Sequence, residues 1–289
     1  MNHELKCPIC SGSSHPDFVK YDYWIYACDH CQHRFAKIPQ AQQHTEMVFV
    51  NDDGYFYEGG SGYLDYTSES DLLISHGERY AGILQKYTRP GRVFDVGSAA
   101  GFILKGLTRK GWTGKGIEPN PTMAAYARKM VHMDVETGIF ERYKTDQKFD
   151  LVTMFQVVGL LYDVRQSLAT VDDLLPNNGL LLIETWDRES WPARLLGHNW
   201  HHYSPPSVVN WFSAEGLDKL VRQFGFEKVA SGRPSKWIIG SHAKSLLKYK
   251  LAGVKGGTLL SRIFNLLPDK LRIPYPAWDL FWALYRKEH

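Results

Sequence analysis

The chain has 289 residues, of which 44% are hydrophobic, 34 are lysine or arginine and 31 are aspartate or glutamate. This length and hydrophobic content predict a folded protein with room for a small module and one larger domain. The formal net charge of +3 is too small to indicate a nucleic-acid-binding protein. No apolar run reaches the roughly 18 residues of a membrane span and no signal peptide is recognisable, so we expect a cytoplasmic protein.

Residues 1–40 contain all four cysteines, arranged as two Cys-x-x-Cys pairs. Cys7 and Cys10 form the first pair, and Cys28 and Cys31 form the second after an interval of 17 residues. Each pair can place two thiolates on one tight turn, and a hairpin between the pairs would bring all four around one tetrahedral zinc ion, as in zinc ribbons. Four thiolates leave no open coordination position, so the spacing favours a structural zinc over a catalytic one.

The ribbon itself is predicted from β-branched and aromatic residues between the cysteine pairs. Strands are expected at residues 18–19 and 21–27, with a third at 34–36. The alternatives are two disulfides in a secreted protein or a redox Cys-x-x-Cys, and neither a signal peptide nor a thioredoxin-like βαβ pattern accompanies them. Three histidines are spare ligands if one cysteine does not bind zinc: His15, His30 and His33.

Residues 41–90 are predicted to be a linker, a lid and a helix that precede the larger domain. The linker is polar and glutamine-rich, and the segment that follows it, residues 55–66, is rich in glycine and tyrosine. Glycines let a segment fold over a ligand and tyrosines can pack on it, so this segment is either a lid or a packed surface turn. A helix is expected over residues 72–87.

A strand, a glycine turn, a helix and a second strand follow over residues 93–118. Gly97 and Gly101 let the backbone turn sharply after the first strand, and residues 103–110 can form the helix. Glu118 ends the second strand, 21 residues after Gly97. At that distance the acid of a nucleoside-binding βαβ unit reaches a ribose hydroxyl.

The turn disfavours a dinucleotide and resembles the motif of a different cofactor-binding family. A dinucleotide site requires Gly-x-Gly-x-x-Gly, whereas Ala99 and Phe102 stand where its second and third glycines belong. The run from Asp95 through Gly97 and Ala99 to Gly101 resembles the Asp-x-Gly-x-Gly-x-Gly motif of class I S-adenosylmethionine-dependent methyltransferases, with alanine at the middle glycine. Alanine costs little there if its φ is negative, and would clash in a strained turn. A glycine turn in some other α/β protein remains the alternative.

Strands and helices continue to alternate, which predicts a parallel α/β sheet. Further strands are expected at residues 134–138, 149–156, 179–186 and 226–230, with helices at 121–130 and around Leu217 and Leu220. The resemblance implies a Rossmann-like, seven-stranded methyltransferase domain over residues 91–289. Its strand order would be 3-2-1-4-5-7-6, with strand seven antiparallel and formed by residues 278–286.

That strand order leaves residues 236–277 as a long insertion, with a helix at 246–251 or 259–267. Its basic residues suit an acidic acceptor, a membrane surface or a solvated helix face.

Ligands bind such sheets beyond the carboxyl ends of the strands. The residues that the resemblance assigns to S-adenosylmethionine are Tyr63, Asp95, Gly97, Gly101, Glu118, Pro119, Gly138, Phe155 and Gln156. In the family the acid binds the ribose hydroxyls, the next residue flanks the adenine, and the end of strand four faces cofactor and acceptor.

Two departures from the family pattern stand out at the strand ends. Gly138 is followed by isoleucine where relatives often have aspartate. The Asp-x-x-Glu-His of many relatives is absent after Gln156, which removes a histidine that some could use as a base.

The segment Trp200-His201-His202-Tyr203-Ser-Pro resembles an aromatic-histidine segment that many small-molecule methyltransferases carry before their last helix. A hydroxyl acceptor needs a base, and histidine suits that role by its near-neutral pKa. His201 and His202 are therefore the catalytic candidates, with structural packing as the alternative. Three tryptophans are predicted to wall the acceptor pocket: Trp186, Trp191 and Trp200.

The resemblance to a zinc ribbon joined to a methyltransferase domain implies an enzyme that transfers a methyl group to a small molecule. O-methylation of a sugar or a related metabolite is the preferred reaction. One alternative is a zinc-containing ribosomal RNA base methyltransferase, which could use Arg34 and Lys37 beside ribbon aromatics. The near balance of basic and acidic residues argues against it. The other alternative is a methyltransferase-like binding protein without turnover, which Ala99 and Gly159 favour.

Overall fold

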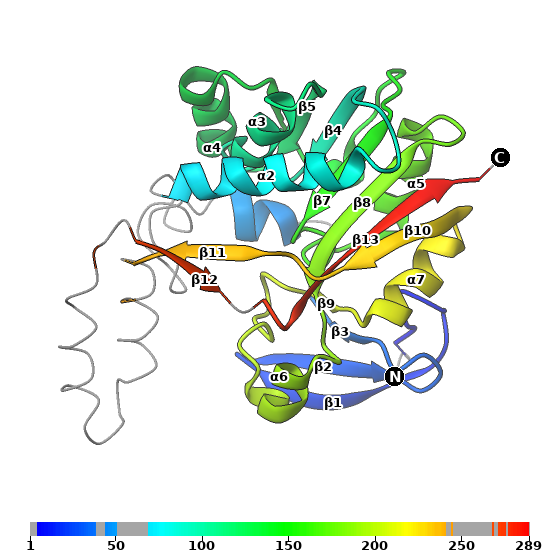
Figure 1. Cartoon of the computed structure of the whole chain (residues 1–289). Helices are drawn as coiled ribbons and strands as arrows, with labels where there is room; N and C mark the ends of the chain where they lie inside the picture. The colour runs from blue at the N-terminus through cyan, green and yellow to red at the C-terminus, as the bar shows by residue number, and fades with distance from the viewer. Residues whose placement is uncertain are drawn as a thin grey trace.

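The computed structural model describes residues 5–38, 44–50, 69–240, 244, 268, 271–275 and 277–288. A seven-stranded sheet lies between two layers of helices, and a smaller sheet packs below it (Figure 1). Across the large sheet the strands are β6 (Val135–Thr137), β5 (Thr113–Glu118), β4 (Arg92–Val96), β7 (Leu151–Phe155), β8 (Leu180–Trp186), β13 (Leu280–Lys287) and β10 (Phe226–Gly232). Only β13 runs antiparallel to its neighbours β8 and β10, so the Rossmann-like order 3-2-1-4-5-7-6 is confirmed.

Helices cover both faces of this sheet because its central strands alternate between two apolar cores. In β8, Leu180 and Leu182 pack with α2 (Ser70–Leu84), α3 (Phe102–Thr108) and α4 (Pro121–Tyr126). Leu181 and Ile183 pack on the other face with α5 (Val164–Leu174) and α7 (Ala214–Arg222). Successive side chains of a strand point to opposite faces, and a strand buried on both faces reads as a continuous apolar run.

The ribbon sheet contains β1 (Ser14–Lys20), β2 (Tyr23–Cys28) and β3 (Arg34–Ala36). The predicted strand at residues 21–27 is wrong at its start, because Tyr21 and Asp22 both have positive φ, at 47° and 67°. They form the two-residue turn of the hairpin, whose left-handed backbone matches the twist of the flanking strands.

A fourth strand, β9 (Asn210–Trp211), comes from the larger domain and pairs with β3. In addition, Cys7 and Ile9 of the ribbon lie in the same apolar core as Phe94 of β4. The larger domain therefore contributes a strand to the ribbon sheet, and the ribbon and the large sheet share an apolar core.

The remaining elements are shorter. They are η2 (Glu46–Val50), η5 (Ala127–Val131), η6 (Phe140–Arg142), α6 (Trp191–Leu196), η7 (Gly197–Asn199), β11 (Lys236–Ile239) and β12 (Arg272–Tyr275). The antiparallel pair β11 and β12 brackets the insertion and is not predicted from the sequence. The lid segment with Tyr63 and the helix expected at 246–251 or 259–267 lie outside the described residues. Within the described part of the chain, no helix has the length and apolar character to cross a bilayer.

Candidate functional site

A cavity of about 260 Å³ opens at the carboxyl ends of the central strands. Six of the residues predicted for cofactor binding line it: Gly97, Glu118, Pro119, Gly138, Phe155 and Gln156. They follow β4, β5, β6 and β7, four neighbouring strands of the sheet. The parallel arrangement thus brings together residues that are up to 59 positions apart in the sequence.

Gly97 forms the sharp turn after β4. Its φ is +68°, and a Cβ atom at this position would lie 2.5 Å from a methyl carbon of Val157. Its N–H donates to the carbonyl of Ile117 at 2.9 Å. Any residue other than glycine would therefore meet both backbone strain and a steric clash.

Ala99 occupies the middle glycine position with a φ of +46°. The condition under which alanine costs little there, a negative φ, is not met. The turn is held by the Ala99 N–H, which donates to Oε2 of Glu118 at 2.8 Å. This hydrogen bond explains how a non-glycine residue is kept in the left-handed region, at a cost of about 1–2 kcal/mol.

Glu118 is 4% exposed and presents a buried carboxylate at the cavity wall. It accepts hydrogen bonds from the backbone N–H groups of Ala99 and Asn120, the second at 2.9 Å. Burial raises its pKa from 4.5 to about 7. The charge of Asp95 also raises this pKa, whereas the two N–H donors lower it. The group is therefore poised to gain from a ligand that donates hydrogen bonds to its charged form.

Asp95 and Gly101 do not line the cavity. The Asp95 carboxylate is 3% exposed and accepts from the hydroxyls of Thr153, at 2.6 Å, and Ser98, at 2.7 Å. Gly101, with a φ of +74°, caps the start of α3. Both residues shape the turn from behind the cavity wall.

A network that sequence reasoning missed also borders the cavity. His76 of α2 lines the cavity, and its Nε2 is 2.9 Å from Oε2 of Glu184 in β8. Tyr80 donates to the same carboxylate oxygen at 2.5 Å, and Gln156 donates to the other oxygen at 2.8 Å. Burial alone would raise the pKa of Glu184, but His76 and Tyr80 outweigh burial and lower it to about 2.

One signal in the sequence could have found this network. Glu184 interrupts an otherwise apolar strand, and a buried acid requires partners. Two of the partners, His76 and Tyr80, sit on a helix 108 and 104 residues earlier, so spacing does not reveal them.

Arg79 brings a positive charge to the same network. Its Nη2 lies 3.1 Å from Nδ1 of His76, and burial lowers the pKa of its guanidinium. Its buried Nε has no hydrogen-bond partner among the residues that the structure describes. A half-buried guanidinium with an unused donor suits a carboxylate ligand.

A family model described as a methyltransferase domain matches residues 73–231, more than half of the chain. The chain belongs to the class I S-adenosylmethionine-dependent methyltransferases. The matched range contains the glycine turn, Glu118 and the network around Glu184.

Named relatives and solved structures agree with the family. The ubiquinone biosynthesis O-methyltransferase of Bradyrhizobium diazoefficiens is 24% identical over 169 residues, which cover 52% of this chain and 66% of the relative. That of Pasteurella multocida is 24% identical over 124 residues, which cover 37% of this chain and 51% of the relative. The chain thus spans between about half and two thirds of the length of these relatives.

Two solved structures share the fold. The crystal structure of a SAM-dependent methyltransferase from Thermotoga maritima matches with a TM-score of 0.51 at 21% identity, covering 76% of this chain and 91% of that one. A SAM-dependent methyltransferase from Archaeoglobus fulgidus matches with a TM-score of 0.53 at 15% identity, covering 82% of this chain and 100% of that one. At these identities the likeness concerns the fold.

The methyltransferase's two predicted catalytic histidines lie outside the cavity wall. His202 stacks on Trp186, with ring centroids 4.6 Å apart, and burial lowers its pKa to about 4. His201 is exposed and packs against His202. Of the three tryptophans predicted to wall the acceptor pocket, Trp186 does line the cavity, together with the unpredicted Trp237.

The other two predicted tryptophans are placed elsewhere. Trp200 is fully buried behind the wall. Trp191 is 54% exposed and packs on Trp278, with ring centroids 4.9 Å apart.

The four ribbon cysteines converge as the spacing predicts. Sγ separations are 3.6 Å for Cys7 and Cys31, 3.4 Å for Cys10 and Cys28, and 3.5 Å for Cys10 and Cys31. These distances are near the ~3.8 Å of four thiolates around a tetrahedral zinc with Zn–S bonds of about 2.3 Å. They far exceed the roughly 2.05 Å of a disulfide. N–H groups of Ile9 and His30 point at the sulfurs of Cys7 and Cys28, at 3.3 and 3.4 Å, so the donor set fits zinc.

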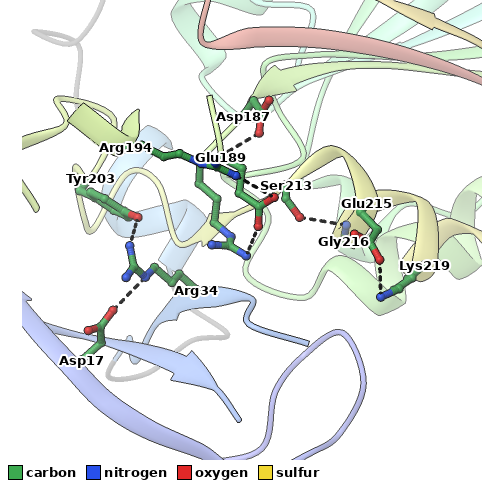
Figure 2. Close-up of polar contacts among 11 residues, drawn as sticks. Asp17, Arg34, Asp187, Glu189, Arg194, Tyr203, Ser213, Glu215, Gly216 and Lys219 are labelled. Carbon is green, nitrogen blue, oxygen red and sulfur yellow. Dashed lines mark hydrogen bonds and ion pairs between the residues drawn. The ribbon is translucent and has the colours of Figure 1, made fainter. Parts of the chain in front are cut away.

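Arg34 of β3 ties the ribbon to the histidine loop. Figure 2 shows its guanidinium between Asp17 and Tyr203. Nε lies 2.8 Å from the Asp17 carboxylate, and Nη1 donates to the Tyr203 hydroxyl at 2.7 Å. These contacts engage Arg34, one of the two basic residues on which the RNA alternative relies.

Proposed function

We propose that this methyltransferase transfers a methyl group to a hydroxyl oxygen of a small molecule, a sugar or a related metabolite. The observation that carries the proposal is a cavity whose lining includes the glycine turn, Glu118 and His76, the last of which is backed by the buried Glu184. An oxygen acceptor needs its proton removed as it attacks, and a histidine oriented by a carboxylate is suited to that task. The name of the curated relatives, O-methyltransferases of ubiquinone biosynthesis, supports the same reaction type.

The donor half of the cavity fits S-adenosylmethionine. Glu118 would accept hydrogen bonds from the two ribose hydroxyls, and Pro119 and Gly138 would flank the adenine. Arg79 would bind the methionine carboxylate. The bound donor supplies an electrophilic methyl group on a sulfonium. The protein's task is then to align the acceptor with that methyl group and to exclude water, and alignment alone can supply much of the rate.

We assign the acceptor to the part of the cavity lined by Trp186, Trp237 and Leu160. Indole faces stack on the apolar faces of a sugar or of an aromatic ring, and they order such a ring without contributing charge. Lys236 also lines this part and can bind an anionic substituent. A small, ring-containing acceptor is therefore a better fit than a base within a long RNA strand.

His76 is our candidate for the base, ahead of His201 and His202, because it lines the cavity and they do not. A proton taken up by its ring is stabilised by Glu184, whose carboxylate stays charged. Arg79 donates a hydrogen bond to Nδ1 of His76, so Nδ1 can accept a proton only after Arg79 has turned toward the carboxylate of the methyl donor. This requirement couples the base to occupation of the donor site.

We also propose that the Cys7, Cys10, Cys28 and Cys31 cluster holds a structural zinc. The metal would fix the ribbon, and β3 of the ribbon pairs with β9. The main chain of β9 in turn binds Gly159, beside the cavity residues Leu160 and Leu161. Zinc would thus support one wall of the acceptor site at a distance.

The test is incubation of the zinc-loaded protein with donor labelled in its methyl group, together with separate pools of small metabolites and of RNA, followed by mass spectrometry. We expect label on a hydroxyl oxygen of a small molecule, a strong decrease in His76→Gln and little change in His201→Ala. Label only in RNA would replace the proposal with the ribosomal RNA alternative. Donor binding without any labelled product would favour the non-catalytic alternative.

A further inference from the structure

Three potential metal ligands converge beside Trp186, and none of them lines the cavity. His201 and His202 belong to the loop after η7, and Asp279 precedes β13. Their nearest ligand atoms all lie within 4.8 Å of one another. No role in the proposed reaction or in the zinc ribbon accounts for this cluster.

The spacing of His202 and Asp279, a long ion pair in this structure, also fits two ligands of one ion. Nε2 of His202 lies 3.4 Å from Oδ2 of Asp279. That distance exceeds the roughly 2.7–3.2 Å of a good N–H···O bond. Two ligands about 2.1 Å from a tetrahedral ion are separated by about 3.4 Å.

The ligands are held in place by the surrounding structure. Asp279 Oδ2 accepts from the indole N–H of Trp200 at 3.2 Å, and its backbone carbonyl accepts from the N–H of Asp187 at 2.7 Å. The ring of His202 is packed between Trp186 and Trp200, with centroid distances of 4.6 and 5.1 Å. Groups that orient ligands before an ion arrives raise the affinity of a metal site.

Burial and charge set the properties of the cluster. Asp279 is 8% exposed and contributes the negative charge, whereas Lys236 acts on His202 as an opposing positive charge. His201 is exposed, so an ion could enter from solvent and keep water at its remaining positions. Two imidazoles and one carboxylate suit zinc, cobalt, nickel or ferrous iron rather than magnesium or calcium.

We propose that His201, His202 and Asp279 form a second metal site, which binds one divalent transition-metal ion through two imidazole nitrogens and one carboxylate oxygen. The site is distinct from the four-cysteine cluster in ligands and location. It does not depend on the identity of the methyl acceptor.

The experiment uses full-length protein whose ribbon has been loaded with zinc, titrated with Co²⁺ and followed by visible absorption. We expect one equivalent of Co²⁺ with the spectrum of nitrogen and oxygen ligands. The intense sulfur-to-cobalt band, which would report exchange into the cysteine cluster, should be absent. His201→Ala and Asp279→Asn should each weaken binding by on the order of tenfold or more. The Asp279→Asn variant keeps an oxygen that accepts the hydrogen bond of the Trp200 indole, and the His201→Ala variant changes an exposed side chain. At least one of the two variants should therefore fold normally.

His132→Asn is the matched control, because it removes an imidazole outside the cluster and asparagine tolerates the left-handed backbone of that position. It should bind Co²⁺ as the parent does. Absence of binding at millimolar Co²⁺ would overturn the proposal. Equal binding by the parent and by both cluster variants would do so as well.

Discussion

The raised pKa of Glu118 makes the affinity for the donor product S-adenosylhomocysteine depend on pH. Without ligand the carboxyl has a pKa of about 7, against an ordinary value of 4.5, because it is buried. A ribose that donates two hydrogen bonds favours the carboxylate, so binding should release a proton wherever Glu118 is protonated in the free protein. Affinity should therefore rise with pH and level off above the pKa of the free protein.

The size of the effect follows from the two pKa values. If the bound pKa returns to its ordinary value, the affinity at about pH 6 should be about tenfold lower than at about pH 8, or about 1.4 kcal/mol. Isothermal titration calorimetry in buffers of different ionisation enthalpy measures both the affinity and the number of protons released. Proton release should approach one near pH 6 and vanish near pH 8.

Two variants isolate the group responsible. Glu118→Gln should bind more weakly and lose most of the pH dependence, because an amide does not titrate. Asp95→Asn should keep a pH dependence, because Asp95 does not line the cavity, but its midpoint should move to lower pH, because the charge of Asp95 contributes to the raised pKa of Glu118. A pH-independent affinity in the parent, or an unchanged pH profile in Glu118→Gln, would refute the reasoning.

Three further outcomes are expected. Removing zinc with a chelator, or Cys10→Ser, should lower the free energy of unfolding by at least about 3 kcal/mol. Circular dichroism should show a single unfolding transition, and separate melting of the ribbon and the large domain would contradict the shared core. Gly97→Ala should cost about 2 kcal/mol or more in denaturant melts, from its φ of +68° and the contact with Val157, whereas Gly82→Ala in open space on α2 should gain ~0.5–1 kcal/mol. Arg79→Met should weaken S-adenosylhomocysteine binding by about 1.5–3 kcal/mol in calorimetry while leaving its pH dependence intact, and unchanged affinity would remove Arg79 from the donor site.

The sheet and the donor half of the site could be predicted because their signals are local. Each strand is a short apolar run, the glycine turn and Glu118 lie within one βαβ unit, and parallel strands bring their ends together. The cysteine pairs are equally local, since each knuckle spans four residues. These features required no knowledge of distant contacts.

The acceptor half depends on long-range packing that no local pattern encodes. His76 meets Glu184 across 108 residues. His202 stacks on Trp186, which lines the cavity, whereas neither His201 nor His202 lines it. β9 is two residues long and acquires strand geometry only by pairing with the ribbon.

Backbone conformation at Ala99 was also beyond local reasoning. The sign of its φ is set by a hydrogen bond to a side chain 19 residues away.

The most direct measurement is a crystal structure of the zinc-loaded protein with S-adenosylhomocysteine. We expect both ribose hydroxyls within hydrogen-bond distance of the Glu118 carboxylate, and the sulfur directed toward Phe155 and Gln156. A cavity that stays empty at saturating ligand, or a ligand whose ribose lies away from Glu118, would contradict the assignment of the donor site.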